Sequence, residues 1–122
     1  MKLLFTLFIA IVLTGCATPS DRRKNPPDIV TSSKKSAKEV TICIAEKWEN
    51  TKPFMTFSSP PVNTTLKLNG YSIMATDRAL AGNTSTFALA DVIENQLEST
   101  TKYYKMGGGG FGDYDQAVKD CQ

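Results

Sequence analysis

Hydrophobic and polar positions divide the chain into three parts. Residues 3–12 are almost entirely apolar, residues 17–33 are polar without an apolar period, and regular patterns return from Ser36 onward. Burying a core requires apolar positions that recur with the period of a helix or a strand. We therefore expect residues 36–122 to form the folded domain and residues 16–35 to form a flexible tether, which could reach about 50 Å when extended.

An amphipathic helix is predicted at the start of this domain. Ser36 and Glu39 have the spacing of a capping box, in which each side chain accepts the backbone N–H of the other residue. The apolar residues that follow recur with the spacing of a helix and form a stripe beside Cys43: Ala37, Val40, Ile44 and Trp48. Because Pro53 follows closely, we expect the helix to end near Asn50.

The clearest strand signal is a hairpin centred on Asn69 and Gly70. Both residues accept the positive φ angles of a type I′ turn, which is a favoured two-residue turn between antiparallel strands. A turn at this position pairs Leu68 with Tyr71, Leu66 with Ile73 and Thr64 with Ala75. These residues form one largely apolar face and the residues between them a mostly polar one, so the turn and the face pattern select the same register.

Residues 85–98 are ambiguous, because their apolar positions fit both a helix and a strand. Residues 100–105 have a strand-like composition. A strand this close downstream favours a strand for the ambiguous segment, with a second hairpin that turns near residues 95–99. At the C-terminus, Asp113 and Gln116 form a variant capping box that opens a short helix to Gln122, with Cys121 on its apolar stripe.

Composition argues against several classes of function. The 14 Lys and Arg residues nearly balance the 12 Asp and Glu residues, whereas nucleic-acid binding requires a concentrated basic surface. The chain has no histidine, which removes the Ser-His-Asp triad, Cys-His nucleophiles and most transition-metal sites. The glycine-rich residues 107–112 lack the Lys and Ser/Thr of a phosphate-binding loop and predict a flexible connection. We expect no catalytic residue, cofactor, metal or nucleic-acid partner.

The N-terminus has the layout of a secretory signal. Lys2 precedes the apolar run, and small residues lead to Cys16. The apolar run is shorter than the roughly 20 residues of a spanning helix. Leu13-Thr14-Gly15-Cys16 resembles the lipobox of bacterial lipoproteins. The resemblance implies that residues 1–15 are removed as a signal peptide and that Cys16 becomes the first residue of the mature protein, with a diacylglyceryl group on its thiol.

The same resemblance bears on location. In Gram-negative lipoproteins an Asp after the lipidated Cys commonly retains the protein at the inner membrane, and this chain has Ala17 at that position. The resemblance therefore implies an outer-membrane protein that faces the periplasm. Two or three acyl chains are sufficient for stable anchoring, so the membrane itself is an expected partner.

Cysteine chemistry completes the predicted fold. Of the three cysteines, lipidation of Cys16 leaves Cys43 and Cys121, which lie on the apolar stripes of the two predicted helices. In an oxidising compartment we predict a disulfide between them, and two buried thiols are the alternative. The prediction is a single small α+β domain: an N-terminal helix, an antiparallel sheet of about four strands in two hairpins, and a short C-terminal helix clipped by the disulfide.

Tyr103 and Tyr104 are the candidates for a binding surface. Adjacent residues of a strand face opposite ways, so we expect one tyrosine in the core and the other exposed beside Lys102 or Lys105. The expected role is a non-enzymatic binding or structural one in the cell envelope, with an envelope protein as partner. The alternatives are a prophage-type exclusion lipoprotein that masks a surface receptor and, from a different class, a histidine-free envelope enzyme.

Overall fold

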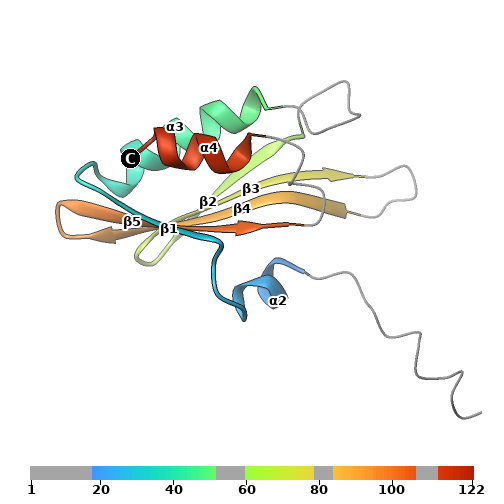
Figure 1. Ribbon diagram of the computed structural model, residues 1–122, viewed down its shortest axis with the longest axis horizontal. Coiled ribbons are helices and arrows are strands. Elements are labelled where there is room, and N and C mark those ends of the chain that lie inside the picture. Colours follow the sequence, from blue (N-terminus) through green and yellow to red (C-terminus); the bar gives the residue numbers. More distant parts are fainter. Residues whose placement is uncertain (1–17, 52–59, 79–83, 107–112) are drawn as a thin grey trace, which may run out of the picture.

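Five antiparallel strands form one sheet with helices on both faces (Figure 1). The computed structural model describes residues 18–51, 60–78, 84–106 and 113–122. The strands are β1 (Ile29–Ser33), β2 (Val62–Lys67), β3 (Gly70–Arg78), β4 (Thr84–Asn95) and β5 (Glu98–Lys105), in the spatial order β1-β5-β4-β3-β2. The helices are α2 (Pro19–Arg23), α3 (Ala37–Glu49) and α4 (Tyr114–Asp120). The α+β class and the antiparallel sheet are as predicted.

The main core lies between the sheet and one pair of helices. Helices α3 and α4 cover one face of the sheet, which we call the inner face, and α2 lies against the opposite, outer face (Figure 1). Trp48 of α3 is central: its indole Nε1 donates a hydrogen bond to the Tyr114 carbonyl at 3.0 Å, and its ring meets those of Tyr103 and Tyr114 edge to face at 6.2 and 5.5 Å. These contacts connect α3, β5 and α4 directly.

Helix α3 begins and ends where the sequence predicts. Ser36 Oγ accepts the Glu39 N–H at 3.2 Å, and Glu39 Oε2 accepts the Ser36 N–H at 2.9 Å. The hydrogen bonds from Ser36 hold the pKa of the Glu39 carboxyl below its usual value. Asn50 is the C-cap. The capping-box prediction is confirmed.

Helix α4 forms as expected but starts differently. Asp113 is its N-cap, yet the aspartate side chain makes no capping hydrogen bond, so the predicted variant capping box is wrong. The ψ angle of Asp113 is 34°, far from the extended backbone that brings a capping side chain over the first amides. Packing and a covalent bond hold the helix instead. The predicted Cys43–Cys121 disulfide is present, with Cα atoms 5.7 Å apart and a sequence separation of 78.

The sheet has five strands rather than about four, because β1 lies in the segment expected to be a tether. This strand pairs with β5 from Ile29 opposite Tyr103 to Ser33 opposite Ser99. Upstream of it, α2 also contacts the sheet. The prediction of a flexible tether is therefore wrong for residues 19–33. The β-branched residues Ile29, Val30 and Thr31 open this strand, but they follow a segment rich in proline and charge. Strand β1 completes the hydrogen bonding of the β5 edge.

The first hairpin is present, but its register differs from the prediction. Lys67 pairs with Gly70 and Leu66 with Tyr71, so the two-residue turn is Leu68-Asn69 and the pairing is shifted by two residues. Gln96 is the only non-glycine residue with positive φ in the described part of the chain, which excludes a type I′ turn here. Gly70 has φ +153°, and a Cβ atom there would overlap the Val92 carbonyl oxygen of β4. The close approach of β4 thus determines where the glycine sits.

The second hairpin agrees with the prediction. Residues 84–95 form strand β4, and Asn95 pairs with Glu98 around a turn in which Gln96 has φ 60°. The strand interpretation of the ambiguous segment is confirmed. The predicted signal peptide, Cys16 and the glycine-rich residues 107–112 lie outside the described residues, as do residues 79–83 of the loop between the hairpins.

Candidate functional site

The N-terminal segment folds into a one-turn helix on the outer face of the sheet. Thr18 caps α2: its hydroxyl accepts the Asp21 N–H at 3.2 Å, and an Asp21 carboxylate oxygen accepts the Thr18 N–H at 3.4 Å. The hydrogen bond from the Thr18 side chain is the main cause that lowers the pKa of Asp21. Pro19 at the first helical position favours this start, because its missing N–H would have no helical partner.

Arg23 attaches this helix to the sheet. Its Nε and Nη2 donate to the two carboxylate oxygens of Asp91, each at 2.8 Å, and Nη2 also donates to the hydroxyl of Ser72 at 2.7 Å. The hydrogen bond with Asp91 raises the pKa of the Arg23 guanidinium. The side chains of Arg23 and Asp91 are 30% and 22% exposed, so the pair is partly shielded from solvent. A bidentate pair of this kind sets orientation as well as attachment.

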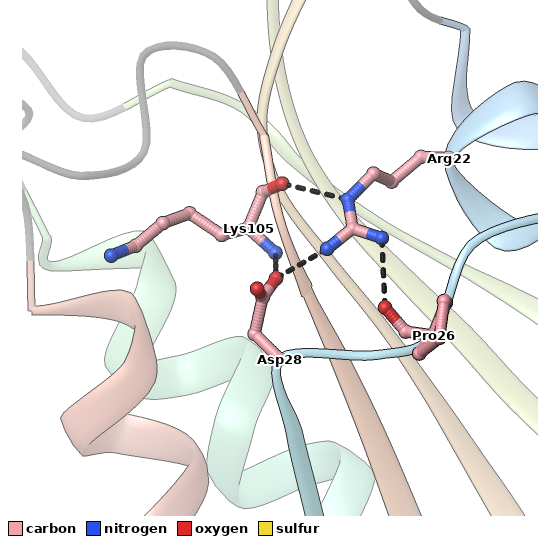
Figure 2. Close-up of polar contacts among 4 residues, drawn as sticks. All are labelled: Arg22, Pro26, Asp28 and Lys105. Atoms are coloured by element: carbon pink, nitrogen blue, oxygen red, sulfur yellow. Dashed lines mark hydrogen bonds and ion pairs between the residues drawn. The ribbon is translucent and has the colours of Figure 1, made fainter.

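Arg22 makes a second attachment, at the point where the chain enters β1 (Figure 2). Its guanidinium pairs with the Asp28 carboxylate and donates to the carbonyl oxygens of Pro26 at 3.0 Å and Lys105 at 3.1 Å. The Asp28 carboxylate also accepts the Lys105 N–H. The guanidinium carbon lies 5.3 Å from the centre of the Tyr104 ring, in cation–π geometry. We call α2, with Arg22 and Arg23 and their partners, the N-terminal clasp.

The two candidate tyrosines are both buried, which differs from the prediction that one of them is exposed. Tyr103 is 1% exposed and Tyr104 is 5% exposed, so neither offers the predicted binding surface. Tyr103 lies in the inner core, and Tyr104 lies on the outer face with Leu89 and Met106, beneath Arg22. Desolvation raises the pKa of both hydroxyls. The opposite orientation of the two side chains is as predicted; their exposure is not, because the outer face is covered as well.

The sequence carries one signal for the clasp, the three consecutive cations Arg22, Arg23 and Lys24. They lie within the segment for which the sequence predicts a flexible tether. In the structure each arginine has its own carboxylate, Asp28 or Asp91, and only Lys24 is largely exposed. An ion pair across 68 residues has no local pattern, so the sequence alone could not assign it.

Two of the hollows in the described part of the chain lie beside the clasp and beside α3. One, of about 490 Å³, lies beside Arg23 and is bordered by the turn at Leu68 and by Ile93. Of its three charged groups, Arg23 and Asp91 already bind each other, which leaves Lys67 as the remaining charge. The second, of about 330 Å³, lies between α3 and β2. Within the described ranges, no group of three or more Cys, Asp or Glu side chains is arranged to hold a metal ion.

No protein-family model, curated protein or solved structure matches this chain. The part of the chain that the structure describes contains no helix long and apolar enough to cross a membrane. Interpretation of the site therefore rests on the residues themselves.

Proposed function

We propose that this protein is a lipid-anchored component of the bacterial cell envelope with a binding or structural role. The observation that carries the proposal is the Leu13-Thr14-Gly15-Cys16 motif at the end of a short apolar run. A thiol at that position can take a diacylglyceryl group, and the small residues before it allow a protease to cut. The Cys43–Cys121 disulfide supports export, because such bonds persist in oxidising compartments.

The N-terminal clasp changes how such an anchor would hold the domain. Thr18 follows Cys16 by two residues, a span of ~7 Å even for fully extended chain. Since Thr18 begins the helix that binds the outer face, the anchor would hold that face close to the membrane rather than on a long tether. The layer of α3 and α4 would then face away from the lipid and toward other envelope components (Figure 1).

The two arginines of the clasp are paired within the protein, so anchoring would not rely on them. Arg22 and Arg23 are engaged by Asp28 and Asp91, so they are not free for anionic headgroups. Attachment to the membrane would depend on the acyl chains, which suffice when two or more are present. With Ala17 after the lipidated residue, we place the protein at the periplasmic face of the outer membrane.

The proposal is tested by replacing the thiol. In a Gram-negative host, Cys16→Ser should abolish labelling by a fatty-acid probe and accumulate as unprocessed precursor. Cys43→Ser removes a different thiol and should keep the label, which makes it the matched control. Density fractionation should find the wild-type protein with outer-membrane markers, and Ala17→Asp should move it to the inner membrane. Normal processing of Cys16→Ser would refute the proposed anchor.

A further inference from the structure

Strand β2 lies at the end of the sheet. No strand among the described residues pairs with it on the side away from β3, and we call this side the open edge of β2. Its residues from Asn63 to Lys67 are all exposed, and the Leu66 side chain is 74% exposed. An edge of this kind presents unpaired backbone groups to any strand that can reach it.

The alternation of hydrogen-bonded pairs between β2 and β3 shows which backbone groups of β2 have no partner on β3. Thr76 N–H donates to the Pro61 carbonyl at 3.0 Å, and Val62 is the next pair along, opposite Ala75. Hydrogen-bonded and non-hydrogen-bonded pairs alternate along antiparallel strands. The N–H and C=O groups of Val62, Thr64 and Leu66 therefore point away from β3, toward the open edge.

A groove follows this edge on the inner face. It lies between β2 and α3, has a volume of about 330 Å³, and its apolar wall is formed by Ile42, Ala45 and Tyr71. Ile42 is 48% exposed, which is high for a large apolar residue on a helix that packs on a sheet. Lys38 borders one end of the helical wall, and Glu46 and Glu49 border the other.

We infer that the open edge of β2 pairs antiparallel with β2 of a second copy of this chain, with Thr64 on the two-fold axis. This register joins the outward-pointing backbone groups of the two strands. It sets Val62 opposite the partner's Leu66 and Thr64 opposite the partner's Thr64, which are favourable cross-strand pairs. The one charged residue of the strand, Lys67, faces the partner's Pro61, so no like charges meet.

The charges on α3 favour a second copy of this chain, rather than a strand of an unrelated protein, as the partner of β2. A two-fold axis perpendicular to the sheet makes α3 and the partner subunit's α3 run antiparallel. Lys38 of each copy then lies toward Glu46 and Glu49 of the partner, and the two grooves meet at Ile42. The surface is thus complementary to itself in charge as well as in strand sequence.

The same axis is compatible with a shared membrane. Rotation about a line perpendicular to the sheet leaves both copies of α2 on the same face, so two anchored N-termini would reach one bilayer. Confinement to a membrane raises the effective concentration of the copies and favours pairing. Strand pairing itself needs no lipid, so the inference goes beyond the proposed function and can fail independently of it.

A cross-linking experiment on the full chain in isolated membranes tests the pairing. Directly opposed residues of a hydrogen-bonded antiparallel pair have Cα atoms about 5.5 Å apart, within the range of a disulfide. Thr64→Cys should give a disulfide-linked dimer under mild oxidation. Ser32→Cys is the matched control, because this exposed residue lies on β1 at the opposite edge of the sheet, and it should stay monomeric.

Sedimentation of the detergent-solubilised protein provides the second readout. The wild type should sediment as a dimer, and Thr64→Lys should be a monomer at the same concentration because it sets like charges on the axis. Thr65→Lys, whose backbone groups face β3, should remain dimeric. Lys38→Glu should weaken the dimer, and Lys38→Glu combined with Glu46→Lys should restore it. A monomeric wild type, equal cross-linking of Ser32→Cys, or capture of a different protein by Thr64→Cys would overturn the inference.

Discussion

Arg23 is the residue on which attachment of the N-terminal segment most depends. Its guanidinium binds both oxygens of Asp91 and the buried hydroxyl of Ser72. Lys24 follows directly in the chain, but its ammonium pairs with Asp21 three residues upstream rather than with the sheet, and its side chain is 77% exposed. The two neighbouring cations therefore differ in what their removal should do.

Arg23→Ala should lower the free energy of unfolding by about 1–3 kcal/mol, since it removes charge-assisted hydrogen bonds and leaves Asp91 partly buried without its partner. In a domain of this size each kcal/mol shifts the melting temperature by ~4–8 °C. Thermal unfolding followed by circular dichroism measures the effect. Lys24→Ala should leave the midpoint unchanged, and equal losses in the two variants would show that Arg23 does not act through its sheet contacts.

The buried tyrosines predict how stability depends on alkaline pH. Desolvation raises the pKa of Tyr114 to about 12, above the value near 10 of an unfolded chain. The stability that follows from this shift is fully present below pH 10 and is lost as pH rises toward 12, because only the unfolded state releases its proton in that window. Melting temperatures measured across this range should fall.

Tyr114→Phe should reduce this alkaline slope. At pH 7 the variant should be as stable as the wild type, because the Tyr114 hydroxyl has no hydrogen-bond partner among the described residues. Adding Tyr103→Phe should flatten the slope further, since burial also raises the pKa of Tyr103. An unchanged slope in the double variant would contradict this account.

Among the elements, the first hairpin shows how tertiary contacts override a local turn preference. Gly70 follows the turn and approaches β4 so closely that a Cβ atom would overlap the Val92 carbonyl oxygen. Gly70→Ala should therefore cost more than about 1 kcal/mol of stability. Asn69→Ala should cost little, because Asn69 does not have the positive φ that a type I′ turn would require. Denaturant unfolding of both variants distinguishes the two registers, and comparable losses would support the type I′ turn.

The disulfide is the element-level feature with the largest expected effect. Helix α4 has seven residues, too few to be stable alone, and Cys121 at its end joins it to α3. For this loop the chain-entropy estimate is about 4–5 kcal/mol. Reduction should lower the melting temperature strongly and increase hydrogen exchange in α4. Cys121→Ala should show the same loss without further response to reductant, and two free thiols in the oxidised protein would contradict the bond.

The sequence predicted the elements whose signals are local. The capping box at Ser36 and the stripe that ends at Trp48 are contained within one helix, and both are confirmed. Strand β1 was not predicted because its five residues are too short a pattern to stand out from the polar segment around them, and their pairing partner β5 lies about 70 residues downstream. The hairpin register was wrong for a related reason, since β4 rather than the turn determines the position of Gly70.

For the molecule as a whole, the candidate site was less predictable than the fold. The sequence predicted the Cys43–Cys121 disulfide, which is present, and lipidation of Cys16, which stays a prediction. It placed Arg22 and Arg23 in a flexible tether and predicted an exposed tyrosine. Long-range ion pairs and the covering of the outer face by α2 leave no periodic trace in a sequence. The result is a domain joined closely to its proposed anchor by the N-terminal clasp.

Mass spectrometry of the N-terminal tryptic peptide of the mature protein tests the central claim most directly. Cleavage after Arg22 should release residues 16–22, and we predict that this peptide begins at Cys16 with a diacylglyceryl group on the thiol. Partial digestion before denaturation should release it slowly, because Arg22 is held by Asp28 and the Lys105 carbonyl. A mature protein that retains residues 1–15, or that carries an unmodified Cys16, would contradict the account.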